Sequence, residues 1–190
     1  MKKFGGLLVL LALSPLAQAH TGHLHGSFMD GVVHPFGFDH LLAMLAVGLW
    51  ASKSLTGMRQ WLAPLAFVMS LLAGAVFSHL TGAAFSWTEG LIAGSVIAFA
   101  GLLVVPKVRQ ALGFALIVSA GVAHGFAHGL EATQGGVFAL YATGFMLTTV
   151  ALHVVGLLAG QRLLTQNWQW QSVGAMMAGY GVYALGMMAG

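Results

Sequence analysis

Two short segments of the chain combine histidines with carboxylates at spacings that could hold a metal ion. One runs from residue 34 to 40 and the other from 124 to 131. The candidate ligands are His34, Asp39, His40, His124, His128 and Glu131. Imidazole nitrogen combined with carboxylate oxygen suits a borderline divalent ion such as nickel, cobalt, zinc or copper(II), and affinity alone does not choose among these metals. The chain has no cysteine, which excludes thiolate metal sites, iron–sulfur clusters, disulfides and thiol nucleophiles.

The second segment has the spacing of a metal clamp on a helix. His124 and His128 stand at i and i+4 and share one helix face, about 40° apart, and Glu131 lies about 20° to the other side of His124. Glu131 is about 10 Å from His124 along the axis, which is too far to share one ion comfortably. We therefore expect the two histidines as ligands and Glu131 as a carboxylate that orients a ligand or forms an entry site.

The first segment does not converge on a regular helix, because His34 and His40 would point about 120° apart. Pro35 and Gly37 predict a partly unwound entry to the helix, in which both histidines and Asp39 can turn toward one point. Such irregular backbone at membrane depth is tolerated where it is buried in protein or lines a cavity. Met44, one turn after His40, continues the same face inward.

Most of the remaining chain is apolar. Hydrophobic residues make up 58% of the 190 residues, charged residues only 6%, and the mean hydropathy is +0.89, a composition typical of an integral membrane protein. At about 20 residues per crossing, this length allows six or seven helices and leaves no room for an ATPase or another soluble domain. The net charge of +3 includes two lysines of an amino-terminal leader, so it gives no argument for a nucleic-acid partner.

Residues 1–19 have the pattern of a secretory signal peptide, with two lysines, an apolar stretch over residues 4–13 and Ala17-Gln18-Ala19 as a small-x-small cleavage site. The alternative is an uncleaved first helix, although the apolar stretch is short for a span. Cleavage leaves residues 20–190 as one membrane domain. Its first residues carry three imidazoles that could capture metal ions, those of His20, His23 and His25.

Turns and charges divide the mature chain into six apolar segments, which predict an all-α bundle of six transmembrane helices. The expected spans are 34–51, 61–80, 88–105, 110–130, 136–160 and 171–189. Secretion through the leader places the mature amino terminus outside, and the carboxyl terminus then also lies in the periplasm. The cationic residues of the mature chain all fall in loops on the cytoplasmic side: Lys53, Arg59, Lys107, Arg109 and Arg162. We therefore expect a multi-pass protein of a bacterial inner membrane, with both histidine segments in its periplasmic half.

Small residues at four-residue spacing predict close helix packing. They are Gly90 and Gly94, Gly121, Gly125 and Gly129, Gly156 and Gly160, and Gly186 and Gly190. The two histidine segments lie in spans one and four, and the odd number of spans between them inverts the second half relative to the first. This arrangement is compatible with an inverted 3 + 3 repeat that has the site at its interface.

Three further ionisable residues lie in or near the spans. His79 is either a functional group or a histidine that bonds between helices, and Glu89 is read as a carboxylate at a helix start. His153, near the cytoplasmic end of the fifth span, is either an exit ligand or a packed histidine.

The two histidine segments resemble the motifs of the HupE/UreJ family of nickel and cobalt permeases, and the resemblance covers essentially the whole mature chain. The first motif reads from His34 to His40 and continues to Trp50, and the second reads His124-Gly-Phe-Ala-His-Gly-Leu-Glu131. The family often has Phe before the second motif, where this chain has Ala123. The resemblance implies nickel as the first substrate and cobalt as the second, and a link to urease or hydrogenase.

These observations predict secondary uptake of the metal rather than an enzyme, with no catalytic residues and no prosthetic group. The chain has no Walker sequence. A divalent cation entering a negative interior gains about 4.6 kcal/mol per 100 mV. We expect capture by the histidine tail, dehydration at the two histidine segments, and release past Met44 and His153.

Three other functions remain open from the sequence. An intramembrane zinc hydrolase would use Glu131 as general base, although no HExxH occurs. A haem-binding electron carrier would use paired axial histidines. A metal sensor or chaperone would use the same ligands without transporting the ion. Neutral histidine is required for metal binding, so affinity should fall as the pH drops through about 6.5, the unperturbed imidazole value.

Overall fold

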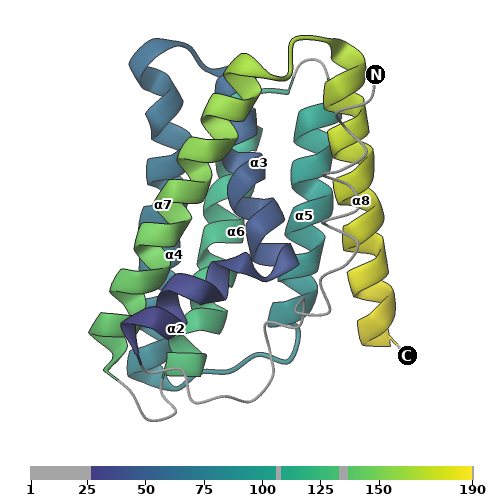
Figure 1. Ribbon diagram of the computed structural model, residues 1–190. Coiled ribbons are helices and arrows are strands. Elements are labelled where there is room, and N and C mark those ends of the chain that lie inside the picture. The colour runs from purple at the N-terminus through teal and green to yellow at the C-terminus, as the bar shows by residue number, and fades with distance from the viewer. Residues whose placement is uncertain (1–26, 106–107, 133–136, 190) are drawn as a thin grey trace.

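The computed structural model describes residues 27–105, 108–132 and 137–189, and all regular structure within these ranges is helical (Figure 1). The elements are α2 (Phe28–Val33), η1 (His34–Phe36), α3 (Phe38–Ser54), η2 (Gly57–Trp61), α4 (Leu62–Thr81), α5 (Thr88–Val104), α6 (Gln110–Glu131), α7 (Phe138–Arg162) and α8 (Asn167–Ala189). The predicted leader, the histidines of the predicted capture tail, Lys107 and Gly190 lie outside the described residues.

Each of the six apolar segments predicted from the sequence overlaps one of the helices α3 to α8, with bounds that differ by up to four residues. By length and composition, four of the described helical segments can cross a membrane, and a fifth candidate arises if the bent pair at the amino-terminal end counts as one span. Helix α5 is apolar but has only 17 residues. The chain is therefore an all-helical, multi-pass membrane protein with four or five candidate spans.

The first span is interrupted where Pro35 and Gly37 predicted a break. Residues Phe28–Phe36 and Phe38–Ser54 meet at an angle of 76°. Pro35 lies in the first turn of the 3₁₀ helix η1, where its missing N–H costs no helical hydrogen bond. Gly37 ends η1 and caps α3 with a non-helical backbone. The short helix α2 therefore lies across the end of the bundle rather than along it (Figure 1).

The helices pack mainly in three pairs, α4 with α6, α3 with α7, and α5 with α8. In the first pair, close approach depends on glycine. A methyl group added at Gly125 of α6 would overlap the Leu71 carbonyl oxygen of α4, and one added at Gly129 would overlap the carbonyl oxygen of Ala75. The packing role predicted for the glycines of this stripe is confirmed.

The predicted packing role holds for some of the other glycines and is wrong for three. Gly156 and Gly160 of α7 are in tight contact with α3. At Gly90, Gly94 and Gly186, by contrast, an added methyl group would meet no atom of the described residues within 4 Å. Four-residue spacing shows that small residues share a face, but whether that face meets another helix depends on the rotation of the helix in the bundle.

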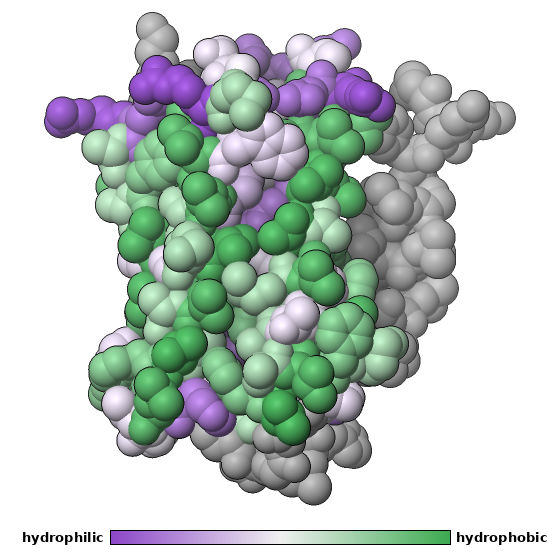
Figure 2. Space-filling model, turned by 90° about the vertical axis from the view of Figure 1, so that its left-hand side faces the viewer, coloured by the Kyte–Doolittle hydropathy of each residue, from purple (hydrophilic) through white to green (hydrophobic). Residues whose placement is uncertain are grey.

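Polar contacts tie together the ends of helices at one end of the bundle. Gln110 Nε2 donates to the Ser54 carbonyl oxygen (3.0 Å), and Gln161 Nε2 donates to Gln60 Oε1 (2.8 Å). The described cationic residues belong to this end: Lys53, Arg59, Arg109 and Arg162. Figure 2 shows a hydrophilic band across one end of a face that is otherwise mostly apolar.

Two alanine substitutions test the glycine contacts. Gly125→Ala forces a methyl group against backbone and should destabilise the protein by about 1–3 kcal/mol, the usual cost of overpacking. Gly94→Ala is the matched control, since it has open space and gains helix propensity, so its stability should be unchanged or higher. Thermal unfolding in detergent measures both. Equal effects of the two substitutions would contradict the packing described here.

Candidate metal centre

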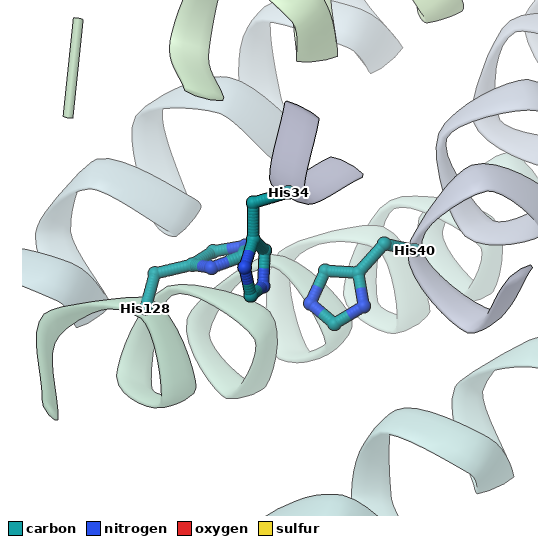
Figure 3. A group of neighbouring side chains, drawn as sticks. All are labelled: His34, His40 and His128. Atoms are coloured by element: carbon teal, nitrogen blue, oxygen red, sulfur yellow. The ribbon is translucent and has the colours of Figure 1, made fainter. Parts of the chain in front are cut away.

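Three histidines from two distant parts of the chain form a buried cluster (Figure 3). His34 comes from η1, His40 from the first turn of α3 and His128 from the last turn of α6. One nitrogen of each imidazole lies within 4.8 Å of the corresponding nitrogens of the other two. The residues are 6%, 0% and 0% exposed, respectively. We call these residues the three-histidine cluster.

The break in the first span brings two of these rings together. His34 and His40 have ring centroids 5.2 Å apart at an interplanar angle of 88°, although a regular helix would direct them about 120° apart. His128 completes the cluster from α6, with its centroid 4.6 Å from that of His34 and 4.8 Å from that of His40.

Asp39 lies behind His40. Its Oδ1 is 2.8 Å from His40 Nδ1 and also accepts the His40 backbone N–H at 2.8 Å. A carboxylate at Nδ1 favours the tautomer with hydrogen on that nitrogen, which leaves the lone pair of Nε2 to face a metal ion. The structure thus places this predicted ligand as a group that orients His40, outside the three-histidine cluster.

Glu131 lies between the other two histidines. Its Oε2 is 3.3 Å from His34 Nε2 and 3.6 Å from His128 Nδ1, and it accepts a hydrogen bond from the Tyr141 hydroxyl at 3.1 Å. The side chain is 18% exposed, more than the histidines that it touches. This position suits a carboxylate that orients ligands and meets an arriving cation.

His124 is adjacent to the cluster but is not brought into it. Its ring centroid is 4.8 Å from that of His40, and its Nε2 lies 3.1 Å from Ser95 Oγ of α5. The group with nitrogens close enough to share one ion joins His128 to the two histidines of the first segment. The i, i+4 clamp of His124 and His128 stays a prediction.

The charges around the cluster match those of a divalent cation. Neutral imidazoles carry no charge, so a buried ion needs nearby anions to offset the cost of its desolvation. Asp39 and Glu131 are in contact with the three-histidine cluster and supply two negative charges when ionised. Three nitrogen ligands also leave further coordination positions for water or an incoming ligand.

The sequence profile of one protein family, described as HupE / UreJ protein, matches residues 8–185 of the chain. The chain belongs to the HupE/UreJ family. It is also 42% identical over 154 residues to Protein HupE of Rhizobium leguminosarum bv. viciae, a match that covers 79% of this chain and 78% of the relative. No solved structure is significantly similar to the chain. The resemblance seen in the two motifs is thereby confirmed.

Two polar residues at the site of this HupE/UreJ protein were not predicted from its sequence. Tyr141 is fully buried in α7, where its hydroxyl contacts Glu131 and lies 3.4 Å from His128 Nδ1. Ser95 of α5 contacts His124. Both lie in apolar segments without a motif, and the usable signal for Tyr141 was that a buried tyrosine hydroxyl needs a hydrogen-bond partner.

The remaining candidate residues are not members of the three-histidine cluster. His79 stacks on Phe138, with centroids 4.1 Å apart at 14°, which is the geometry of a packed side chain. Glu89 lies in the first turn of α5, as expected. Met44 and His153 are fully buried.

Removing the Tyr141 hydroxyl tests its part in this HupE/UreJ site. Tyr141→Phe leaves Glu131 without the hydrogen bond that positions it between His34 and His128, so metal affinity should fall by about tenfold, at the lower end of the effects of such supporting groups. Equilibrium dialysis with Co²⁺ on purified protein measures the affinity. Tyr183→Phe, at an exposed position, is the control and should bind as the wild type does. An unchanged affinity in Tyr141→Phe would remove this residue from the site.

Proposed function

We propose that this protein carries out secondary, potential-driven uptake of a divalent transition metal, nickel first and cobalt next, from the periplasm into the cytoplasm. The observation that carries the proposal is the three-histidine cluster, which is buried between helices and joined by two carboxylates. Membership of the HupE/UreJ family supports it, together with the resemblance of both motifs to those of nickel and cobalt permeases. The metal would then serve a urease or hydrogenase.

The proposed topology has six spans in a bacterial inner membrane: the bent pair of helices at the amino-terminal end, the four helices long enough to cross, and the shorter α5. The cationic end of the bundle would face the cytoplasm by the positive-inside rule. The three-histidine cluster lies at the start of α3 and the end of α6, opposite that cationic end. Both mature termini would then lie in the periplasm, after removal of residues 1–19.

Two of the helix pairings fit an inverted 3 + 3 repeat, whereas the contacts of α5 with α3 and α6 have no comparable counterpart between α8 and either of these helices. Such a repeat exchanges α3 with α6, α4 with α7, and α5 with α8. Under this exchange, the contact between α4 and α6 corresponds to the contact between α7 and α3, and both pairs are closely packed. The third pair, α5 with α8, corresponds to itself. The three-histidine cluster would lie where the two halves meet, since His40 belongs to the first half and His128 to the second.

In this mechanism the protein exchanges hydration water for imidazole nitrogen. Asp39 would hold His40 with Nε2 toward the ion, and Glu131 would attract the cation and support the other two histidines. A transport site must bind strongly enough to admit the ion and weakly enough to release it. The membrane potential contributes about 4.6 kcal/mol per 100 mV for a divalent ion, enough for roughly three orders of magnitude of accumulation without ATP.

The test is uptake of radioactive nickel into sealed vesicles that contain purified protein, with an imposed inside-negative potential. Uptake should depend on the potential and should be reduced by cobalt more than by zinc or copper(II). If the protein binds nickel but no nickel enters the vesicles, the permease proposal fails, and a sensor or chaperone, or a zinc hydrolase, becomes the better explanation of the cluster.

Substitutions within the three-histidine cluster should stop transport in the same assay. His40→Ala and His128→Ala each remove a ligand and should reduce uptake to background, and Glu131→Gln, which keeps the shape but removes the charge, should reduce it partly. His79→Ala is the control at a packed histidine and should retain most of the uptake. Wild-type flux in His128→Ala, at matched expression, would overturn this assignment of the site.

A further inference from the structure

Three aromatic rings, one each from α6, α4 and α7, form a row of contacts that begins at His40 of the three-histidine cluster. The ring centroid of His40 in α3 is 4.8 Å from that of His124 in α6. The centroid of Phe67 in α4 lies 5.7 Å from that of His124 and 5.2 Å from that of His153 in α7. Phe67 is fully buried, and its ring contacts both His124 beside the outer site and His153 of α7.

His153 has an environment that packing alone does not explain. It is 0% exposed, and neither of its ring nitrogens has a hydrogen-bond partner among the described residues. A buried polar group without a partner costs about 1–3 kcal/mol, and an apolar side chain of similar shape would avoid this cost. The free-energy cost of burying this imidazole without a partner is offset if a metal ion binds to it during part of the transport cycle.

Thr149 stands one turn before His153 on the same face of α7 and has a similar environment. It is fully buried, and its Oγ1 has no partner within the described segments. Other threonines of α7 behave differently, since Thr143 donates to the Ala139 carbonyl oxygen (2.7 Å) and Thr148 to that of Val32 (2.9 Å). A hydroxyl and an imidazole at i and i+4 are neighbours on a helix surface.

His153 lies further toward the cationic end than the three-histidine cluster. A methyl group added at Gly48 would overlap the His153 carbonyl oxygen, so His153 is level with a residue about 12 Å beyond His40 along α3. His153 also lines an apolar groove of about 310 Å³ that reaches Trp61, the last residue of η2, which also contains Arg59. The groove lies between α4 and α7, the helices on the side of the molecule that Figure 2 presents.

We propose that His153 and the Thr149 hydroxyl form an inner binding station for the divalent ion, on the cytoplasmic side of Phe67. The inference rests on the proposed uptake function and deepens it. The ion would pass Phe67 after leaving the three-histidine cluster and rest on one imidazole nitrogen, one hydroxyl oxygen and water. The described residues provide no carboxylate contact to His153, so this station is weaker than the outer site and favours release.

The first test compares His153→Gln with His79→Gln in the nickel uptake assay. Glutamine keeps hydrogen-bonding capacity but is a poor ligand for these metals. The maximal rate in His153→Gln should fall at least tenfold while KM stays within twofold, since the outer site sets KM, and His79→Gln should transport as the wild type does. A wild-type rate in His153→Gln would overturn the inner station and leave the uptake proposal intact, whereas absent uptake in the wild type would overturn the uptake proposal itself.

The second test observes the metal directly and does not depend on flux. The natural chain has no cysteine, so His153→Cys introduces a unique thiol. Cobalt(II) added to this purified variant should produce a thiolate-to-cobalt charge-transfer band in the near ultraviolet, because thiolate is a strong ligand and a coordinated thiol is deprotonated. His79→Cys is the control and should show no such band. Absence of the band in folded His153→Cys, at cobalt concentrations that saturate the outer site, would contradict the inner station even if His153→Gln does not fold.

Discussion

The break in the first span is the constraint on which the site depends. On a continuous helix His34 and His40 would point about 120° apart, and no single ion could contact both. The 76° bend between η1 and α3 places their rings 5.2 Å apart. The bend falls where Pro35, which lacks an N–H, occupies the first turn of η1 and where Gly37, with an extended backbone (φ −53°, ψ 138°), ends η1 and caps α3. The irregular backbone of the break is tolerated at this depth because α2 and η1 pack against α7.

Two carboxylates, those of Asp39 and Glu131, offset the cost of placing a cation among the histidines that the bend brings together. Three imidazoles buried between apolar helices are neutral as metal ligands, and a divalent cation among them would be costly without anions nearby. Asp39 and Glu131 contact the cluster from opposite segments and also restrict the ring orientations. Tyr141 in turn holds Glu131. Affinity, ring orientation and charge balance therefore come from the same few hydrogen bonds.

Close packing of α4 against α6 determines the direction in which the histidines of α6, His124 and His128, point. Gly125 and Gly129 let α6 approach the backbone of α4, and their positions set the rotation of α6. That rotation directs His128 toward His34 and His40, and it directs His124 toward Ser95 and Phe67. Through His40, whose ring is 4.8 Å from that of His124, the three-histidine cluster is in contact with the row of rings that leads to His153. In this protein the helix contacts determine both the binding site and the route that we propose beyond it.

The amino-acid sequence alone determined the membrane class, the positions of the helical segments and the residue types at the site. These properties depend on composition and on local spacing. The segment predicted as a span over 61–80 therefore agrees closely with α4, which runs over Leu62–Thr81. The break predicted at Pro35 is likewise present. Only the tertiary structure decided which histidines meet, because convergence depends on the direction of a bend and on the rotation and distance of helices far apart in the chain. His124 was expected in the clamp for its local spacing with His128, yet α5 holds it at Ser95. Asp39 lies behind His40, and Tyr141 had no local pattern to mark it.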